Sequence, residues 1–386
     1  MSARSRVLQA FEHTQPDRTP FFEKLIKSPI ADRLLGRPCA ATNFDYQMQR
    51  LADGDWRGLQ EQSARDLVDL AVMLGFDIIR LHMNGLPPDE ASRPRRLGPG
   101  RWRIGGVVTE LLPTGWLRSK PIEPGPVQSE QEQEERLRHD LRAEPAEPSL
   151  DERQFAMLRH AKRLMAEEGL DLAVFSEVYG IGVATLPPFV LRWFATDPGL
   201  IHRYFQRQQV ACAARCRWLA AEGVDVIGLG GDLASDLGPM VSPAHYRELV
   251  MPYVREQARL CRRLGAKSTN ATDGDIWSIA DDFLLGSQVD GYEEIDFAAG
   301  MDMATLKHRY GESTTLVGNI DIRHTLTGGR PEAVRQHTVD CIRAGWGNGG
   351  HVLMSSNCIH ESCRLDLFVQ YVNAYRDYFG LPAISV

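Results

Sequence analysis

The stretch GHVLMSSNCIHESC, residues 350–363, decides the fold. An apolar run, Val352–Met354, changes abruptly into the mostly polar and reactive run Ser355–His360. This pattern is typical of a buried strand that ends in a functional loop. If it is the last strand of a closed barrel, the earlier strands should also end in polar residues, and all of these ends should meet at one site.

Junctions of one kind recur along the rest of the chain. In each, a helical pattern ends at a glycine and a short, mostly apolar strand follows, as in LRHAKRLMAEEGLDLAVFSEV over residues 158–178. The glycines are Gly75, Gly169, Gly223, Gly265, Gly286, Gly311 and Gly347. We expect each of them to close its helix in the left-handed conformation. With a short strand at Phe21, the seven junctions predict eight strands.

Eight βα units favour an α/β fold, a single (β/α)8 TIM-type barrel over residues 1–386. A doubly wound open sheet is the alternative, but no glycine-rich fingerprint such as GxGxxG follows an early strand. Insertions after strands 1 and 2 interrupt the repeat over residues 28–57 and 101–149. The first is predicted to be loosely structured. The second is predicted to contain a hairpin over residues 101–121 and a solvated connector with a short helix over residues 124–149.

Charge and composition restrict the classes of partner. Lys and Arg number 44 and Asp and Glu 51, so the net charge is −7, and no basic run of the kind that binds nucleic acid is present. No window is apolar over the ~18 residues that a membrane helix needs, and the N-terminus lacks a secretory pattern. Seven cysteines without a CxxC pair fit a reducing compartment. The sequence therefore predicts a cytoplasmic protein that acts on small molecules, without nucleic acid or membrane partners.

Polar side chains follow every predicted strand. In chain order they are Glu23 and Lys24; Arg80 and His82; Ser176, Glu177 and Tyr179; Asp232 and Asp236; Asn270, Thr272 and Asp273; Glu293, Glu294 and Asp296; Asn319, Asp321 and Arg323; and Asn357, Cys358 and His360. Any strand becomes polar where it leaves the core, so a single member of this set indicates little. Several carboxylates in one mouth, however, should raise the pKa of at least one of them and provide an acid or a base.

A metal site is a separate hypothesis. Cys358 and His360 are two residues apart, and a thiolate and an imidazole near Glu177 or Glu23 would complete a zinc site with an open position. In the alternative interpretation, Cys358 is a buried thiol and His360 a loop imidazole with satisfied hydrogen bonds. The ligand types alone leave both interpretations open.

Several blocks together resemble the uroporphyrinogen decarboxylase superfamily. They are SRVLQAFEHTQPDRTP (residues 5–20), GGDLASDLGPMVSPAHYRELVMPYV (230–254), the block around Asp273, GMDMATLKHRYG (300–311), VGNIDIRHTLTGG (317–329) and the closing strand. The superfamily includes the decarboxylase of haem synthesis and many corrinoid-dependent methyltransferases. The resemblance implies a (β/α)8 barrel with its site at the carboxyl ends of the strands. It covers most of the chain and thins between residues 28 and 150.

Departures from the superfamily patterns narrow the implied activity. Residues 21–40 lack the Arg-rich motif with which the decarboxylase grips its porphyrinogen, and Asn357 replaces its late histidine. The zinc-dependent methyltransferases bind metal through His-x-Cys on strand five and a Cys on strand eight. The first motif falls on Ala271-Thr272-Asp273, so only Cys358 is retained. The branch that remains similar moves a methyl group from an O- or N-methylated substrate to a corrinoid carried by a partner protein.

The resemblance therefore implies a corrinoid-dependent methyltransferase, a demethylase, that acts on a small methylated substrate, aromatic ones included. Its catalytic candidates are Asp232, Asp273, Glu177, Cys358 and His360, of which Cys358, Glu177 and His360 are also candidate zinc ligands. The candidates for substrate binding are Glu23, Arg80, His82, Tyr179, Asn270, Asn319, Asp321 and Asn357. A decarboxylase or lyase on a small carboxylic acid, anchored by Arg80 or Arg323, and a non-catalytic binding barrel are the alternatives. The superfamily is often dimeric, which makes a homodimer a further expectation.

Overall fold

A curled, seven-stranded parallel sheet forms the centre of the computed structural model, which describes residues 1–386 except 113–114, 124, 126–127, 179 and 386. The strand order is β1-β6-β7-β10-β11-β12-β13. The strands are β1 (Ile78–Arg80), β6 (Ala173–Glu177), β7 (Val226–Gly228), β10 (Lys267–Ala271), β11 (Gly291–Glu293), β12 (Thr315–Val317) and β13 (His351–Val352). All neighbours in this order pair in parallel, which is consistent with a TIM-type barrel.

The segment Pro20–Ile26 lies between β13 and β1, the two edges of this sheet. The Asp77 amide donates to the Phe21 carbonyl (2.8 Å), and the Phe22 amide donates to the Leu353 carbonyl (3.1 Å). Phe21 and Leu353 form an isolated parallel bridge. The strand predicted at Phe21 is thus present as single bridges and not as a ladder.

Side chains alternate between the interior of the sheet and the helix layer, as the pleat requires. Residues that point inward form one buried cluster: Phe22, Ile78, Ala173, Phe175, Val226, Val317, Val352 and Met354. Helix α1 (Ala3–Phe11) adds Val7, Ala10 and Phe11 to this cluster. The amide of Gly350, just before β13, donates to the Ala10 carbonyl (2.8 Å). Because Gly350 precedes its strand, α1 closes the amino-terminal end of the sheet interior.

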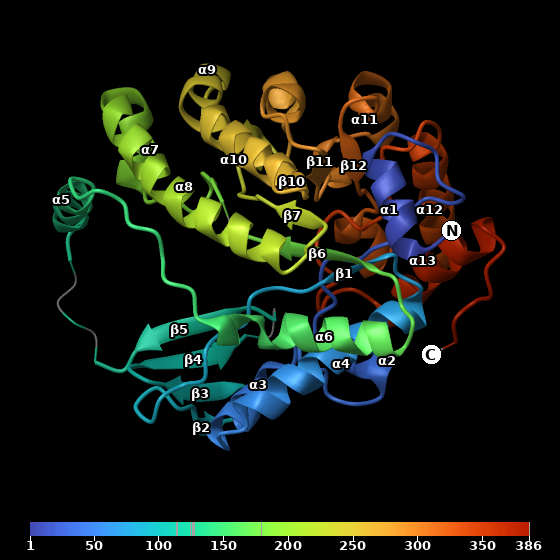
Figure 1. The fold of residues 1–386 in the computed structure, drawn as a ribbon, viewed down its shortest axis with the longest axis horizontal. Coiled ribbons are helices and arrows are strands. Elements are labelled where there is room, and N and C mark those ends of the chain that lie inside the picture. Colours follow the sequence, from blue (N-terminus) through green and yellow to red (C-terminus); the bar gives the residue numbers. More distant parts are fainter. Residues whose placement is uncertain (113–114, 124, 126–127, 179, 386) are drawn as a thin grey trace.

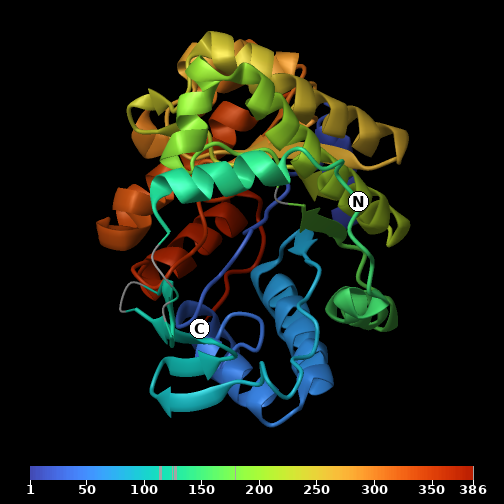
Figure 2. The same ribbon diagram turned by 90° about the vertical axis from the view of Figure 1, so that its left-hand side faces the viewer.

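Helices cover the outer face of the sheet (Figure 1, Figure 2). The longer ones are α4 (Trp56–Leu74), α6 (Ala156–Glu167), α8 (Pro198–Ala221), α10 (Met251–Arg263), α12 (Pro331–Gly345) and α13 (Leu365–Tyr378). Shorter ones are α7 (Pro188–Thr196), α9 (Pro243–His245), α11 (Met303–Tyr310) and the π-helices Tyr246–Val250, Asp281–Gly286 and Ile322–Leu326. In α13 the buried residues Leu367, Phe368, Tyr371, Val372 and Tyr375 recur at helical spacing, so one apolar stripe faces the sheet.

Five of the seven junction glycines have the expected positive φ, namely Gly75, Gly169, Gly223, Gly265 and Gly347. The other two expectations are wrong. After Gly286 the left-handed residue is Gln288, with φ 59°, because the chain continues two residues further before it turns. Gly311 has φ −65°, and a Cβ there would lie 2.5 Å from the Lys307 carbonyl oxygen, so it allows a close approach and not a left-handed turn.

Residues 28–57, predicted to be loosely structured, contain two whole helices, α2 (Ile30–Leu35) and α3 (Phe44–Ala52), and the first residues of α4. Buried polar contacts hold this segment: Asp66 of α4 accepts from the Ala40 amide (2.7 Å) and from Arg37 Nη2 (2.7 Å). Two short helices fixed by such contacts give little apolar periodicity, which is why the sequence pattern missed them.

A second sheet, antiparallel and four-stranded, lies beside α3 (Figure 1). Its strands are β2 (Arg95–Gly98), β3 (Arg101–Ile104), β4 (Val107–Leu111) and β5 (Leu117–Pro121), so the predicted hairpin is part of a larger unit. Trp102 is buried and its Nε1 donates to Asp45 of α3 (2.7 Å). The connector carries the predicted short helix, α5 (Glu130–Asp140), and a small hairpin follows β7 as β8 (Ala234–Ser235) and β9 (Gly238–Pro239).

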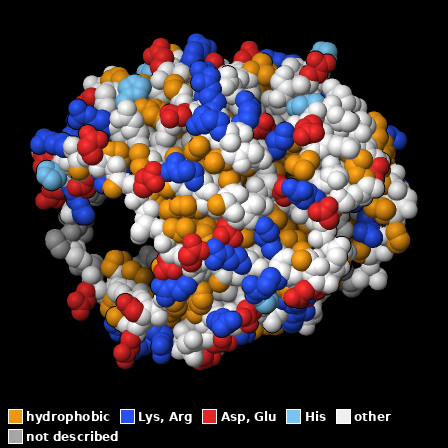
Figure 3. Space-filling view, in the orientation of Figure 1, with side chains coloured by type: hydrophobic (Ala, Val, Ile, Leu, Met, Phe, Trp, Pro, Cys, Tyr) orange, Lys and Arg blue, Asp and Glu red, His pale blue; other side chains and the backbone are white. Residues whose placement is uncertain are grey.

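The surface carries both positive and negative side chains. On the face in Figure 3, basic and acidic side chains are interspersed and neither forms a large area of its own. Among the described residues, no helix combines the length and apolar character needed to cross a bilayer.

Candidate active site

Two adjoining hollows open at the carboxyl ends of the strands. The larger, of about 340 Å³, has as its charged lining residues Lys24, Arg80, Glu177, Asp232, Asp273 and Glu294. The second, of about 280 Å³, adds Asp296, Arg323, His360 and Glu361. Both are lined by Trp116, Asp273, Asn357 and Cys358, so they form one space, which we call the mouth cavity. Residues from widely separated strand ends are therefore brought together.

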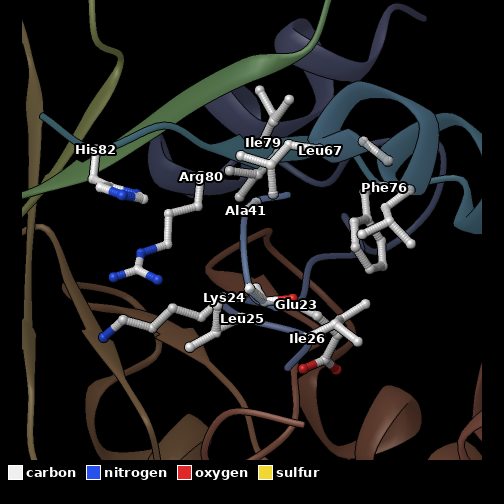
Figure 4. A pocket seen from close by; sticks show the side chains of 14 residues that line it. Glu23, Lys24, Leu25, Ile26, Ala41, Leu67, Phe76, Ile79, Arg80 and His82 are labelled. Atoms are coloured by element: carbon white, nitrogen blue, oxygen red, sulfur yellow. The ribbon is translucent and has the colours of Figure 1, made fainter. Parts of the chain in front are cut away.

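An ion network crosses the floor of this cavity. Lys24 Nζ lies 2.7 Å from Glu177 Oε1 and 3.0 Å from Glu294 Oε1. It also lies 3.3 Å from Glu293 Oε2, and Arg80 Nη2 lies 2.5 Å from Glu177 Oε2. In Figure 4 the side chains of Lys24 and Arg80 extend to the same side. Two cations thus face three carboxylates.

The network keeps Lys24 and Glu177 charged despite their burial, whereas burial raises the pKa of Glu293. Burial alone would lower the pKa of Lys24, but Glu293, Glu294 and Glu177 hold this pKa well above its usual value. Burial opposes the charge of Glu177 as well, and Lys24 and Arg80 nevertheless lower the pKa of its carboxyl. Glu177 is therefore an ionised partner of two cations and not a proton donor.

Asp273 lies in an environment that raises the pKa of its carboxyl, in contrast to that of Glu177. Asn357 Nδ2 donates to its Oδ1 (3.0 Å) and Oδ2 (2.8 Å). Burial raises the pKa of Asp273 to about 7, the carboxylates of Glu294, Asp232 and Asp296 act in the same direction, and the Asn357 hydrogen bonds oppose them. A carboxyl with such a pKa can donate or accept a proton near neutral pH.

Arg323, the second arginine of the mouth, is engaged by carboxylates. It donates to both oxygens of Asp236 (2.8 and 2.7 Å) and to Asp296 Oδ2. Asp296 also accepts from the Gly274 amide (3.2 Å), which ties the loop after β11 to the loop after β10. Arg323 therefore positions loops around the cavity.

The predicted zinc ligands do not form a metal site as they lie. Glu177 is held by Lys24 and Arg80, Cys358 has its pKa raised by burial, and His360 Nδ1 accepts from the Ser362 amide (3.2 Å). Within the described ranges, no group of three or more His, Cys, Asp or Glu side chains is arranged to hold a metal ion. Zinc needs convergent, deprotonated donors, and these residues do not fit that requirement.

Glu23 and His82 line a smaller cavity of about 50 Å³, which shares Lys24, Leu25 and Arg80 with the lining of the mouth cavity (Figure 4). It is largely apolar, with residues of α4 such as Leu67 on its wall. Burial lowers the pKa of His82 to about 4, and Arg80 adds to this effect. His82 is therefore neutral and faces an apolar space.

Three further candidates for substrate binding lie outside the lining of both hollows. Asn270 is buried beside Ala271, which does line the mouth cavity, because successive strand residues face opposite sides. Asn319 donates to the Met301 carbonyl (2.7 Å). Asp321 accepts from backbone amides of its own turn, including that of Thr325 (2.9 Å). Tyr179, the remaining candidate, is outside the described residues.

Trp116 is a lining residue that sequence reasoning missed. It directly precedes β5 and is 65% exposed. Lys27 Nζ lies 4.0 Å from the centre of its ring. A Cβ on the neighbouring Gly115 would overlap Glu361, so the hairpin reaches the loop after β13. The sequence signal that could have indicated Trp116 was a large aromatic residue near the turn of a predicted hairpin, because two strands alone cannot bury a tryptophan.

Gly274→Ala is expected to destabilise the fold by about 2–3 kcal/mol, since strain and a backbone clash add. Gly274 has φ +86°, and a Cβ there would lie 2.5 Å from the Ser235 carbonyl oxygen. Gly300 has φ +87° but open space around its Cβ position, so Gly300→Ala should show only the strain, about 1 kcal/mol. Urea unfolding of both variants measures the difference. Equal losses would mean that the Ser235 contact has no energetic weight.

A family model and one whole-chain superposition agree with this architecture. Residues 179–378 match the family model described as uroporphyrinogen decarboxylase (URO-D). A methyltransferase from Methanosarcina mazei superimposes with a TM-score of 0.65 at 15% identity, over 98% of this chain and 99% of that one. A sugar phosphate isomerase/epimerase from Parabacteroides distasonis has a TM-score of 0.33 at 11% identity, over 59% and 77% of the two chains. No curated protein sequence matches. At 15% identity the first superposition establishes the fold alone.

Proposed function

The chain belongs to the uroporphyrinogen decarboxylase (URO-D) family, and from that premise we propose that it moves a methyl group from a small O- or N-methylated substrate to a corrinoid carried by a partner protein. The family and fold are those of an enzyme of decarboxylase or methyltransferase type. One observation carries the choice between the two. Carboxylates outnumber cations in the mouth cavity, and one of them, Asp273, binds a proton near neutral pH.

In this proposal the segment Pro20–Ile26 is the eighth strand of a (β/α)8 TIM-type barrel, since it hydrogen-bonds to both edges of the sheet. Residues 1–386 are then one domain, interrupted over residues 28–57 and 101–149. The mouth cavity is the active site of that barrel, in the place where such barrels carry their catalytic groups.

Asp273 acts on the heteroatom that loses the methyl group. The corrinoid, when its carrier protein is docked, supplies the nucleophile that accepts the methyl group. As the carbon–oxygen bond of a methyl ether breaks, its electron pair stays on oxygen, and the Asp273 proton moves to that oxygen so that a neutral alcohol or phenol results. Asn357 orients the carboxyl through its hydrogen bonds to both oxygens, and the ionised Asp273 is then reprotonated from solvent.

Exposed apolar side chains at the rim support a docked partner. Trp116 is 65% exposed, Leu237 is 98% exposed and Phe297 is 42% exposed. Leu237 follows Asp236 and Phe297 follows Asp296, the two carboxylates that bind Arg323, so both lie beside the mouth. Large apolar side chains left in water around an opening are typical of a surface that another protein covers.

Decarboxylation is less well supported, because a carboxylate substrate needs an available cation. Lys24 and Arg80 are paired with Glu177, and Arg323 with Asp236 and Asp296. An acidic substrate would in addition meet the carboxylates that line the same cavity. Its repulsion from them favours a neutral or cationic substrate instead.

The test is an anaerobic assay with chemically reduced corrinoid and two matched panels. One contains methoxyaromatics and methylated amines, and the other contains the corresponding small carboxylic acids. We expect methylcobalamin, followed by its absorption spectrum, with at least one methylated compound and no carbon dioxide from any acid. Carbon dioxide without methylcobalamin would instead identify a decarboxylase. If neither product forms, the proposed function is rejected in favour of a non-catalytic binding barrel.

A further inference from the structure

A chain of short hydrogen bonds connects the buried Glu23 to the mouth cavity. The Ser355 amide donates to Glu23 Oε1 (3.0 Å), and Ser355 Oγ lies 2.5 Å from Glu23 Oε2. The same Ser355 Oγ lies 2.5 Å from the Asn357 carbonyl oxygen. Asn357 in turn donates through Nδ2 to Asp273 Oδ2 (2.8 Å). Glu23 therefore reaches Asp273 through two residues of the loop after β13.

The count of hydrogens on this chain favours the neutral form of Glu23. A serine hydroxyl carries one hydrogen, and a carbonyl oxygen can only accept. If Ser355 donates to the Asn357 carbonyl, the hydrogen in the 2.5 Å contact with Glu23 must come from the Glu23 carboxyl. If Glu23 is ionised, Ser355 Oγ must donate its hydrogen to Glu23 Oε2. Ser355 Oγ and the Asn357 carbonyl oxygen would then lie 2.5 Å apart with no hydrogen between them. Only the neutral carboxyl satisfies every contact.

The surroundings of Glu23 agree with a neutral acid. Its side chain is 4% exposed and faces Ser355, Tyr371 of α13 and Cys363, none of which is basic. Burial raises the pKa of Glu23 to about 8, although the Ser355 and Tyr371 contacts oppose the rise. Glu23, which was predicted to bind substrate, is thus buried and instead holds the loop after β13 through Ser355.

We propose that neutral Glu23 is a positioning residue that holds the turn Ser355–Asn357 in the place where Asn357 orients Asp273, and that ionisation of Glu23 releases this turn. The proposal rests on the proposed function only in the use made of Asp273 as an acid. The groups that face Asp273 are Glu294, Asp232, Asp296 and Arg323 besides Asn357. Because Asn357 stabilises the ionised form of Asp273, release of the turn should raise the pKa of Asp273.

Two substitutions separate the two ends of this chain. In Glu23→Gln, the amide nitrogen can donate to Ser355 Oγ and the amide oxygen can accept from the Ser355 amide, so the neutral arrangement is kept at every pH. In Ser355→Ala the hydroxyl is lost and both contacts of Ser355 Oγ disappear. The first variant imitates protonated Glu23, and the second imitates the released turn.

Infrared titration with isotope-labelled aspartate measures both carboxyls without any assay of activity. We expect an unlabelled protonated-carboxyl band at pH 7 that disappears as the pH passes about 8 and is absent from Glu23→Gln. We expect the labelled band of Asp273, identified by its loss in Asp273→Asn, to titrate unchanged in Glu23→Gln and ~1 pH unit higher in Ser355→Ala. An unlabelled pH 7 band that Glu23→Gln leaves undiminished would overturn the proposal, as would an Asp273 titration that Ser355→Ala does not move.

A kinetic arm distinguishes this proposal from the proposed function. If Asp273 is the acid for methyl transfer, the pH profile of kcat/KM in Ser355→Ala should move by the same amount as the infrared titration. A shifted titration with an unshifted rate profile would reject the role of Asp273 and leave the role of Glu23 intact.

Discussion

Asp273→Asn is expected to lower kcat/KM for demethylation of a methyl ether by about 10²–10⁴-fold, the range typical of a lost general acid. Asparagine has nearly the same size as aspartate but cannot transfer a proton to the departing oxygen. In the wild-type protein the active form is the protonated one. Because burial places the pKa of Asp273 at about 7, kcat/KM should fall as the pH rises through that value.

The control for this substitution lies in the substrate. A quaternary ammonium compound releases a neutral amine and needs no proton, so Asp273→Asn should affect its demethylation much less than that of an ether. Asp232→Asn is the matched variant in the same cavity: it removes a negative charge that raises the pKa of Asp273, so the pH profile should move to lower pH. Equal losses with both substrate types would point to a damaged cavity instead of a lost acid.

Lys24→Met is expected to lower the free energy of unfolding by about 3–5 kcal/mol at pH 7, because it leaves buried carboxylates without their shared cation. Lys24 is the common partner of Glu177, Glu293 and Glu294, and the side chain of Glu293 is 1% exposed. Arg80 pairs with Glu177 and can compensate the charge of that carboxylate. Urea unfolding at pH 7 measures the loss.

The double variant Lys24→Met with Glu293→Gln should recover part of this stability, since it removes one uncompensated charge along with its partner. Lys27→Met is the matched lysine control. The Lys27 ammonium lies over the ring of the exposed Trp116, and the loss of this contact should cost under ~1 kcal/mol. A Lys24 variant no less stable than the Lys27 variant would mean that the three carboxylates are protonated or hydrated without it.

Much of the site follows from local sequence. Apolar strands alternating with glycine-ended helices place Glu177, Asp273 and Cys358 at the carboxyl ends of three different strands, and the curled parallel sheet brings these ends together. Trp116 could not be predicted in this way. Its place over the mouth depends on contacts of the antiparallel sheet with Lys27 and with the loop at Glu361, and no local pattern specifies them.

Polar strand ends also include residues that only resemble catalytic groups. Asp321 binds the amides of its own turn, and Asn319 binds the Met301 carbonyl, so both satisfy the backbone. Glu23 holds Ser355 from behind the strand wall. A sequence shows that an acid or amide follows a strand, but the identity of its hydrogen-bond partner depends on the direction of one side chain, which the pattern does not encode.

Helix α1 has a consequence for the order of events. Val7, Ala10 and Phe11 fill the amino-terminal end of the sheet interior, so within the described chain the mouth cavity is reached from its rim. Substrate and corrinoid carrier would then use the same opening of the mouth cavity. Under the proposed function, the substrate would enter before the carrier docks, and the demethylated product would leave only after the carrier does. A blind-ended chamber of this kind would make the reaction sequential with a compulsory order, and carrier departure would be part of every turnover.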